Sequence, residues 1–185
     1  MSGHNKWQQI KHRKGISDQK KGQVFSKLAN KITIAARSGA DPSTNYKLQS
    51  VIDEARAVNM PKENIERAVK RAAEKDAVSL NEVIIQAMGP GSVAVVIEAI
   101  TDNKNRTIAE IKNILVKNEF KIVPEMSLNW MFRLKPDGLG PARGTGWAPK
   151  NPLEAGDLAV RQKFDKLLEE LAVNDDVENV YSNLK

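Results

Sequence analysis

Apolar residues recur at three- and four-residue steps in three short segments of the first half of the chain, the spacing of one helix face. The first segment begins near Ser17 and ends before Gly39, the second follows the turn Asp41-Pro42-Ser43, and the third begins at Pro61. The recurring positions are Val24, Phe25, Leu28 and Ile32, then Leu48, Val51, Ile52, Ala55 and Val58, then Ile65, Ala68, Val69 and Ala72. This pattern predicts a three-helix domain over residues 17–78.

The pattern changes beyond residue 79, where β-branched runs and strand-like alternation appear. In chain order we expect strands at Glu82–Met88 and Val93–Thr101 joined by the turn Gly89-Pro90-Gly91-Ser92, a helix at Asn105–Lys117, a strand at Ser127–Leu134, a helix around Phe164–Leu171 and a strand at Val177–Tyr181. Residues 135–156, rich in Gly and Pro, are predicted to be a loop. The fold class is therefore α+β, with a ferredoxin-like antiparallel α/β sandwich over residues 79–185.

Composition narrows the class of protein. Apolar residues make up 41% and charged residues 28% of the 185 residues, as in folded globular proteins. The absence of cysteine excludes a disulfide framework, a thiolate metal site and a cysteine nucleophile. Since no run approaches the roughly 20 apolar residues that span a bilayer, we expect no membrane partner.

Charge divides the chain in two. Residues 1–75 hold sixteen Lys/Arg against seven Asp/Glu, a net charge of +9, whereas residues 76–185 have a net charge of −3. Residues 1–16 lack hydrophobic periodicity and are predicted to form a basic arm that becomes ordered on binding. Because neutralising phosphates releases counterions, the N-terminal half is the expected binder of a polyanion, most commonly a nucleic acid.

The residues expected to contact nucleic acid are mostly cations of this half. Lys20, Lys27 and Lys31 recur at steps of seven and four, on one helix face with few acids nearby. Trp7 either stacks on an unpaired base or packs on the helical domain. The full set is His4, Asn5, Lys6, Trp7, Lys11, His12, Arg13, Lys14, Lys20, Lys21, Lys27, Lys31, Lys62 and Arg106.

Catalysis, cofactors and metals are not expected. His4 and His12 lie eight residues apart with no cysteine and few carboxylates, which makes a poor metal site. The segment Gly138–Gly146 lacks the Gly-Lys-Ser/Thr of a phosphate-binding loop and is interpreted as a linker, with Trp147 after it against the sheet. The polar run Asp102–Thr107 is best explained as helix capping by Asn103 or Asn105, and Arg106 remains a candidate contact. No catalytic residue and no small-molecule substrate are predicted.

Four segments, in the same order along the chain, resemble the signatures of one family. They are Gly3-His4-Asn5-Lys6-Trp7 with Ile10-Lys11-His12-Arg13-Lys14, then Asn59-Met60-Pro61-Lys62-Glu63-Asn64-Ile65-Glu66-Arg67-Ala68, then Gly89-Pro90-Gly91, then Thr101-Asp102-Asn103-Lys104-Asn105-Arg106-Thr107. On these motifs the chain resembles the YebC/PmpR family. The resemblance implies a probable transcriptional regulator or a translation factor, and its mitochondrial members are translational activators.

Two departures from the family pattern stand out. Family members usually carry a third α/β domain after the strand that ends here near Leu134, where this chain has only Pro136–Gly156. Functions that depend on that domain are therefore in question. Glu119-Phe120 stands where the family tends to have glycines, which predicts an altered helix end.

Together these observations predict a non-enzymatic translation activator that acts through RNA or the ribosome. The alternative is a DNA-binding transcriptional regulator, for which Asn64, near the start of the third helix, could read adenine. A clear helix-turn-helix pair with base-reading side chains is not evident, which weakens that alternative. Asn5 is similar to the mitochondrial members of the family, so the expected compartment is the mitochondrial matrix, with the bacterial cytoplasm as the alternative.

Overall fold

The computed structural model describes residues 18–74, 80–136, 145–154 and 157–185. The chain divides into two compact units. A helical unit lies within residues 16–80, and an α/β unit comprises Asn81–Lys135 and Gly146–Lys185. Each unit has its own hydrophobic core, and each is described separately.

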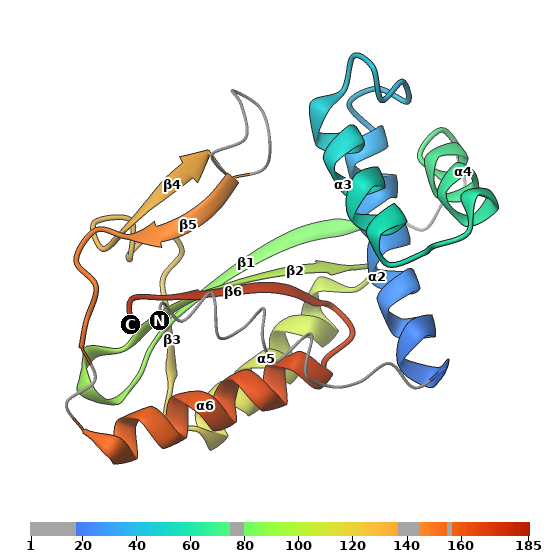
Figure 1. Cartoon of the computed structure of the whole chain (residues 1–185). Helices are drawn as coiled ribbons and strands as arrows, with labels where there is room; N and C mark the ends of the chain where they lie inside the picture. The colour runs from blue at the N-terminus through green and yellow to red at the C-terminus, as the bar shows by residue number, and fades with distance from the viewer. Residues whose placement is uncertain (1–17, 75–79, 137–144, 155–156) are drawn as a thin grey trace. The chain divides into compact units, whose positions relative to one another are not determined.

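The helical unit consists of three helices, α2 (Asp18–Ala36), α3 (Tyr46–Ala57) and α4 (Lys62–Arg71), drawn from blue to green in Figure 1. Its core comes from the predicted apolar stripes, with Ile32, Leu48 and Ala55 fully buried. Pro61 precedes the first residue of α4, where its missing N–H is not needed. The predicted three-helix arrangement is therefore present in the structure.

Two buried polar side chains fasten these helices together. Asn45 caps α3 by accepting from the Leu48 N–H at 3.1 Å, and its amide donates to the carbonyl oxygens of Ala35 at 2.8 Å and Gly39 at 2.7 Å. The Thr33 hydroxyl on α2 lies 3.0 Å from the carbonyl oxygen of Ala68 on α4. Asn45 thus fixes the junction of α2 with α3, and Thr33 fixes the approach of α4 to α2.

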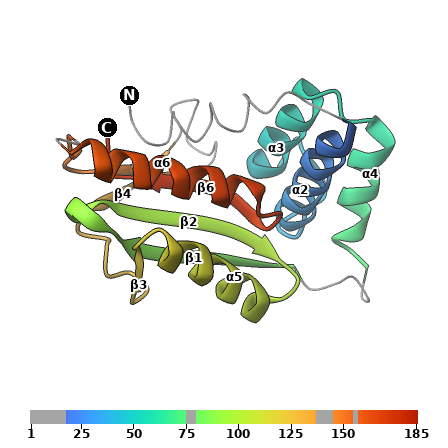
Figure 2. The same cartoon turned by 90° about the horizontal axis from the view of Figure 1, so that it is seen from below.

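The α/β unit is built on a four-stranded sheet in the order β3-β1-β2-β6. Strands β1 (Asn81–Met88) and β2 (Ala94–Thr101) form the central hairpin through the short turn Pro90–Ser92. At its two edges run β3 (Lys121–Val123) and β6 (Val177–Ser182), so that every neighbouring pair is antiparallel. Helices α5 (Lys104–Lys117) and α6 (Leu158–Val173) lie side by side on one face of the sheet (Figure 2).

The other face of the sheet carries a second, smaller core. Leu128 and Phe132 pack there against Val96 and Tyr181, with Trp147 partly buried beside them. The Trp147 indole Nε1 donates to Glu98 at 3.0 Å, which satisfies the polar edge of the ring. Trp147 therefore lies against the sheet, as its position in the sequence predicted.

The α+β class and the antiparallel sheet with helices on one face are confirmed. For the four-stranded sheet and its two helices the connection order is β-β-α-β-α-β, with a separate two-stranded sheet inserted before the last helix. A ferredoxin-like fold runs β-α-β-β-α-β, so the similarity is one of layers. The prediction of a loop over 135–156 is wrong in part, because β5 (Thr145–Pro149) pairs with β4 (Phe132–Pro136). The strand expected at 127–134 begins only at Phe132, after a series of turns.

Glu119-Phe120, for which the sequence predicts an altered helix end, follows α5 with the backbone geometry of a glycine-type helix end. Glu119 adopts φ 64°, a conformation that favours glycine, directly after α5. Phe120 is buried, and its N–H donates to the carbonyl oxygen of Leu115 at 2.8 Å, which closes a Schellman motif. A Cβ built on Gly89 would lie 2.4 Å from the Phe120 ring, so this aromatic requires a glycine in the facing hairpin turn.

Candidate nucleic-acid interface

Many of the predicted contact residues lie outside the described part of the chain. The basic-arm residues are His4, Asn5, Lys6, Trp7, Lys11, His12, Arg13 and Lys14, and all eight fall in this category. Lys20 belongs to α2, but its side chain is likewise outside the described part. The remaining predicted cations can be placed.

The α2 lysines do not form a single free face. Lys31 is only 16% exposed at its side chain and lies 3.5 Å from Glu54 of α3. Lys27 is half-buried, and Lys21 is exposed. On a helix with 3.6 residues per turn, the side chains of Lys27 and Lys31 lie about 140° and 180° around the helix axis from Gly22, on the other side of α2. Lys31 is therefore engaged within the helical unit.

Lys62 and Arg106 lie in different units and different surroundings. Lys62 is 89% exposed at its side chain and lies 3.6 Å from Glu66 one turn on. Arg106 on α5 is surrounded by carboxylates, with Asp102 at 2.9 Å, Asp176 at 3.1 Å and Glu110 at 4.0 Å. The hydrogen bond with Asp176 and the charge of Asp102 raise the pKa of Arg106 above its usual value. This arginine thus joins α5 to the start of β6, and we leave it out of the proposed interface.

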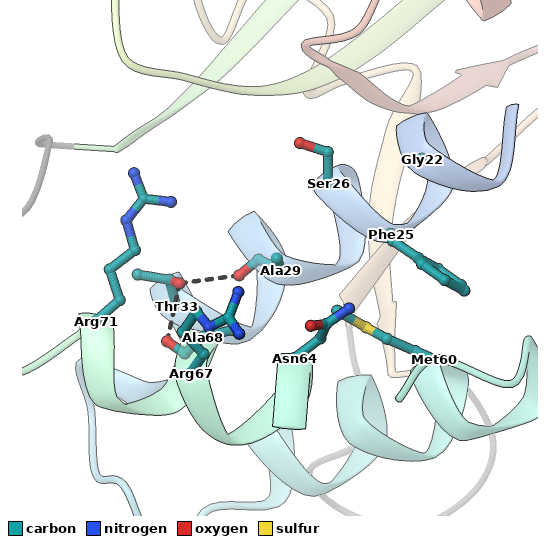
Figure 3. A pocket seen from close by; sticks show the side chains of 10 residues that line it. All are labelled: Gly22, Phe25, Ser26, Ala29, Thr33, Met60, Asn64, Arg67, Ala68 and Arg71. Atoms are coloured by element: carbon teal, nitrogen blue, oxygen red, sulfur yellow. Dashed lines mark hydrogen bonds between the residues drawn. The ribbon is translucent and has the colours of Figure 1, made fainter. Parts of the chain in front are cut away.

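A groove of about 280 Å³ lies between α2 and α4 of the helical unit (Figure 3). Gly22, Phe25 and Ser26 line it from α2, and Asn64, Arg67 and Arg71 line it from α4. Phe25 and Met60 lie toward one end and Arg71 toward the other, with Arg67 between them. The floor is therefore partly apolar and aromatic, and the side formed by α4 is cationic.

No described carboxylate lines this groove. Arg67 and Arg71 lie one helical turn apart, and none of the residues that line the groove is acidic. Within the described ranges, neither guanidinium forms a hydrogen bond or an ion pair with another residue. A groove with two guanidinium groups along one side and an aromatic ring at one end suits a ligand that carries phosphate and a flat apolar group.

The outer face of α4 has a different character. Glu63 and Glu66 are exposed there, and Glu66 also draws Lys62 toward itself. Lys62 and Lys70 are exposed on the same face, so its charge is mixed, whereas the groove side carries arginines and no described carboxylate. Asn64, which the sequence suggested for reading adenine, lines the groove beside α2 instead.

Arg67 and Arg71 were missed by reasoning from sequence. Asn64, Arg67 and Arg71 recur at steps of three and four, which places them on one face of a helix. That spacing was available in the sequence. What it could not provide was the neighbour of this face, because the approach of α4 to α2 is fixed by the distant pair Thr33 and Ala68.

In the ranges described above, no group of three or more His, Cys, Asp or Glu side chains could hold a metal ion. No helix among those same residues combines the length and apolar character needed to cross a membrane.

Comparison with known proteins identifies relatives over most of the chain. The profile of the TACO1/YebC protein N-terminal domain matches residues 5–75, and that of the TACO1/YebC second and third domain matches residues 80–136. A probable transcriptional regulatory protein of Geobacter sulfurreducens, GSU1074, is 47% identical over 137 residues, which cover 73% of this chain and 56% of that protein. One of Dictyoglomus turgidum is 39% identical over 185 residues, covering 99% of this chain and 71% of that protein.

A solved structure supports the same assignment. The crystal structure of the conserved hypothetical protein Aq1575 from Aquifex aeolicus matches with a TM-score of 0.81 and 29% identity, over 95% of both chains. The chain spans about half the length of the first curated relatives it matches, 56% in the case of GSU1074. Since the two family profiles together match well over half of its residues, the chain belongs to the TACO1/YebC family.

Proposed function

We propose that this chain is a non-enzymatic regulator of gene expression that holds nucleic-acid phosphates with its positively charged N-terminal half. The observation that carries the proposal is the pair Arg67 and Arg71, two guanidinium groups without a described carboxylate partner in a groove free of acids. The net charge of +9 over residues 1–75 supports it, because such a surface attracts a polyanion over a long range.

The relatives favour DNA as the target, since several are named probable transcriptional regulatory proteins. These relatives come from bacteria, which favours the bacterial cytoplasm over the mitochondrial matrix that Asn5 suggested, and none of these relatives supports the matrix. A role in transcription through DNA therefore has broader support from the relatives than a role in translation.

A second candidate is translation activation through RNA or the ribosome. One feature favours it: the groove has Phe25 at one end and two arginines along its α4 side, and an unpaired base can reach such an aromatic ring whereas a base in a duplex cannot.

The test is nucleic-acid binding by the full chain at several salt concentrations. Substituting Lys11, Arg13 and Lys14 by Ala should weaken binding and reduce the slope of log K against log[salt] by about two to three. A matched control substitutes Lys104, Lys112 and Lys121 of the α/β unit, which are exposed and remove the same charge. Equal effects of the two triple variants, or no binding by the wild type, would contradict the proposal. Duplex DNA, RNA and ribosomes assayed side by side separate the two candidates.

A further inference from the structure

The groove between α2 and α4 has features that general attraction to phosphate does not require. A surface that only tracks a phosphate backbone needs cations, yet this groove has Phe25 and the buried Met60 at one end, with Arg67 and then Arg71 along its length. Phe25 is half-buried, so one side of its ring is held by the helical core while the rest borders the groove. The combination of an aromatic surface with two cations is typical of sites for single strands, where bases stack and phosphates pair.

We propose that this groove binds an unpaired nucleotide of a single strand, with its base against Phe25 and Met60 and its phosphates on Arg67 and Arg71. The proposal rests on the function proposed above and makes it more specific, because it names the form of nucleic acid and the residues that select it. The shared chemistry of the ligand is a base next to a phosphodiester, whether the sugar is ribose or deoxyribose.

Gly22 supports a ligand at this position. A Cβ built on this glycine would meet nothing within 4 Å, so the packing of the described residues does not require a glycine there. A glycine inside a helix nevertheless lowers helix stability relative to alanine. Gly22 lines the groove together with Ser26, and the missing side chain leaves the α2 backbone open to a close approach. This is the usual reason for a glycine where a ligand meets a backbone.

The polar groups of the groove fit the same ligand. Asn64 and the Ser26 hydroxyl line it, and within the described ranges neither side chain is hydrogen-bonded to another residue. An amide that donates and accepts can pair with the edge of a base, and a hydroxyl can donate to a phosphate oxygen. The α4 side of the groove thus offers phosphate contacts at Arg67 and Arg71 and a base-edge contact at Asn64.

The experiment compares one labelled oligonucleotide, as RNA and as DNA, with its own duplex at constant salt. The full chain should bind the strand more tightly than the duplex. R67Q/R71Q should lose about 5- to 100-fold in affinity for the strand and much less for the duplex, the range expected for stacking and phosphate contacts. The charge-matched control K62Q/K70Q, on the outer face of the same helix, should weaken strand and duplex binding equally.

Two further variants keep the result independent of folding. G22L introduces a better helix former into open space, so its thermal stability should equal or exceed that of the wild type while its side chain blocks the groove. Phe25→Leu should lower affinity for the strand but leave affinity for an abasic strand of the same length unchanged. Circular dichroism of each variant verifies the fold.

Each outcome separates this inference from the proposed function. If the wild type binds strand and duplex equally, or if G22L and R67Q/R71Q bind the strand like the wild type, the groove inference is wrong while nucleic-acid binding stands. If G22L and R67Q/R71Q keep their binding to the strand but lose binding to an acidic peptide of ten glutamates, the occupant of the groove is a protein. The inference is then likewise overturned. If the wild type binds no nucleic acid, the proposed function itself fails. Groove-dependent binding of either RNA or DNA supports the inference and identifies the accepted sugar.

Discussion

The two units hold their arginines in opposite ways. In the helical unit, Arg67 and Arg71 line a groove without a described carboxylate partner. In the α/β unit, Asp102 and Asp176 lie 2.9 and 3.1 Å from Arg106 and neutralise its charge. A cation that already has carboxylate partners must lose them before it can bind a phosphate, whereas an unpaired cation keeps its full attraction. Positive charge in the sequence therefore identifies a binding surface only after its partners are known.

The largest expected effect comes from removing the buried side chain that joins α2 to α3 in the helical unit. Asn45→Ala removes the cap of α3 and the amide that donates to the carbonyl oxygens of Ala35 and Gly39. The Ala35 carbonyl keeps only the N–H of Ser38 at 3.4 Å. We expect the helical unit to lose about 2–4 kcal/mol of stability, from the lost cap and the lost side-chain donor of the Gly39 carbonyl. Hydrogen exchange should show faster exchange in α2 and α3 with unchanged protection in β1 and β2. Equal loss of protection in both units would contradict the separate roles of their cores.

The next prediction concerns the α/β unit, where a substitution at Thr107 disturbs the carboxylate partners of Arg106. Thr107 is fully buried, and its hydroxyl lies 2.8 Å from Thr101 Oγ1 and 2.5 Å from an Asp176 oxygen. Thr107→Val removes this donor from the Asp176 carboxylate and should cost about 1–3 kcal/mol. Chemical denaturation measures the loss. Strand binding should remain that of the wild type, and a parallel loss of binding would show that the α/β unit contributes to the interface.

A carboxylate placed in the groove should make it resemble the surroundings of Arg106. Ser26 is exposed and lines the groove, so the carboxylate of Ser26→Glu should pair with Arg67 or Arg71. We expect the affinity for the strand to fall about tenfold, close to the free energy of one charge-assisted hydrogen bond. Gln23→Glu adds the same charge on the same helix, at an exposed position that does not line the groove. Fluorescence anisotropy compares the two. If both lower the affinity equally, the effect is one of net charge and the groove has no special role.

The smallest expected effect concerns pH and the α/β unit. Lys117 lies 2.9 Å from Glu170, and its hydrogen bond lowers the pKa of Glu170 below the ordinary 4.5. Because the folded pKa is lower than the unfolded one, the stabilisation is present above the unfolded pKa and is lost as the pH falls through the folded pKa. The stability difference between the wild type and Lys117→Met should therefore shrink as the pH falls below about 4.5. A difference that stays constant down to low pH would contradict this origin.

The parts of the fold that could be predicted from the sequence are those determined by residues close together in the chain. The helices and the hairpin were predictable, because side-chain caps such as Asn103 and turn residues such as Gly91, at φ 65°, act over a few positions. The short strands Lys121–Val123 and Thr145–Pro149 were missed, because each is defined by a partner strand and carries little pattern of its own.

The candidate site shows the same division. The charge of the N-terminal half and the cations of α2 were visible in the sequence, but the partner of Lys31 is Glu54 on another helix and could not be read from spacing. The partner of Arg106 could not be predicted from spacing either, because Asp176 lies 70 residues away in the chain. Which cations are free for a ligand is decided by tertiary contacts, and so the groove arginines emerged only from the structure.

The central claim is that the helical unit, and not the α/β unit, holds the nucleic acid. Photocrosslinking tests it most directly: a strand containing one photoreactive base is irradiated with the full chain, and the attached peptides are identified by mass spectrometry. The account predicts crosslinks within residues 1–74, with the peptide that contains Phe25 among them and absent in R67Q/R71Q. Crosslinks confined to residues 81–185 would contradict it.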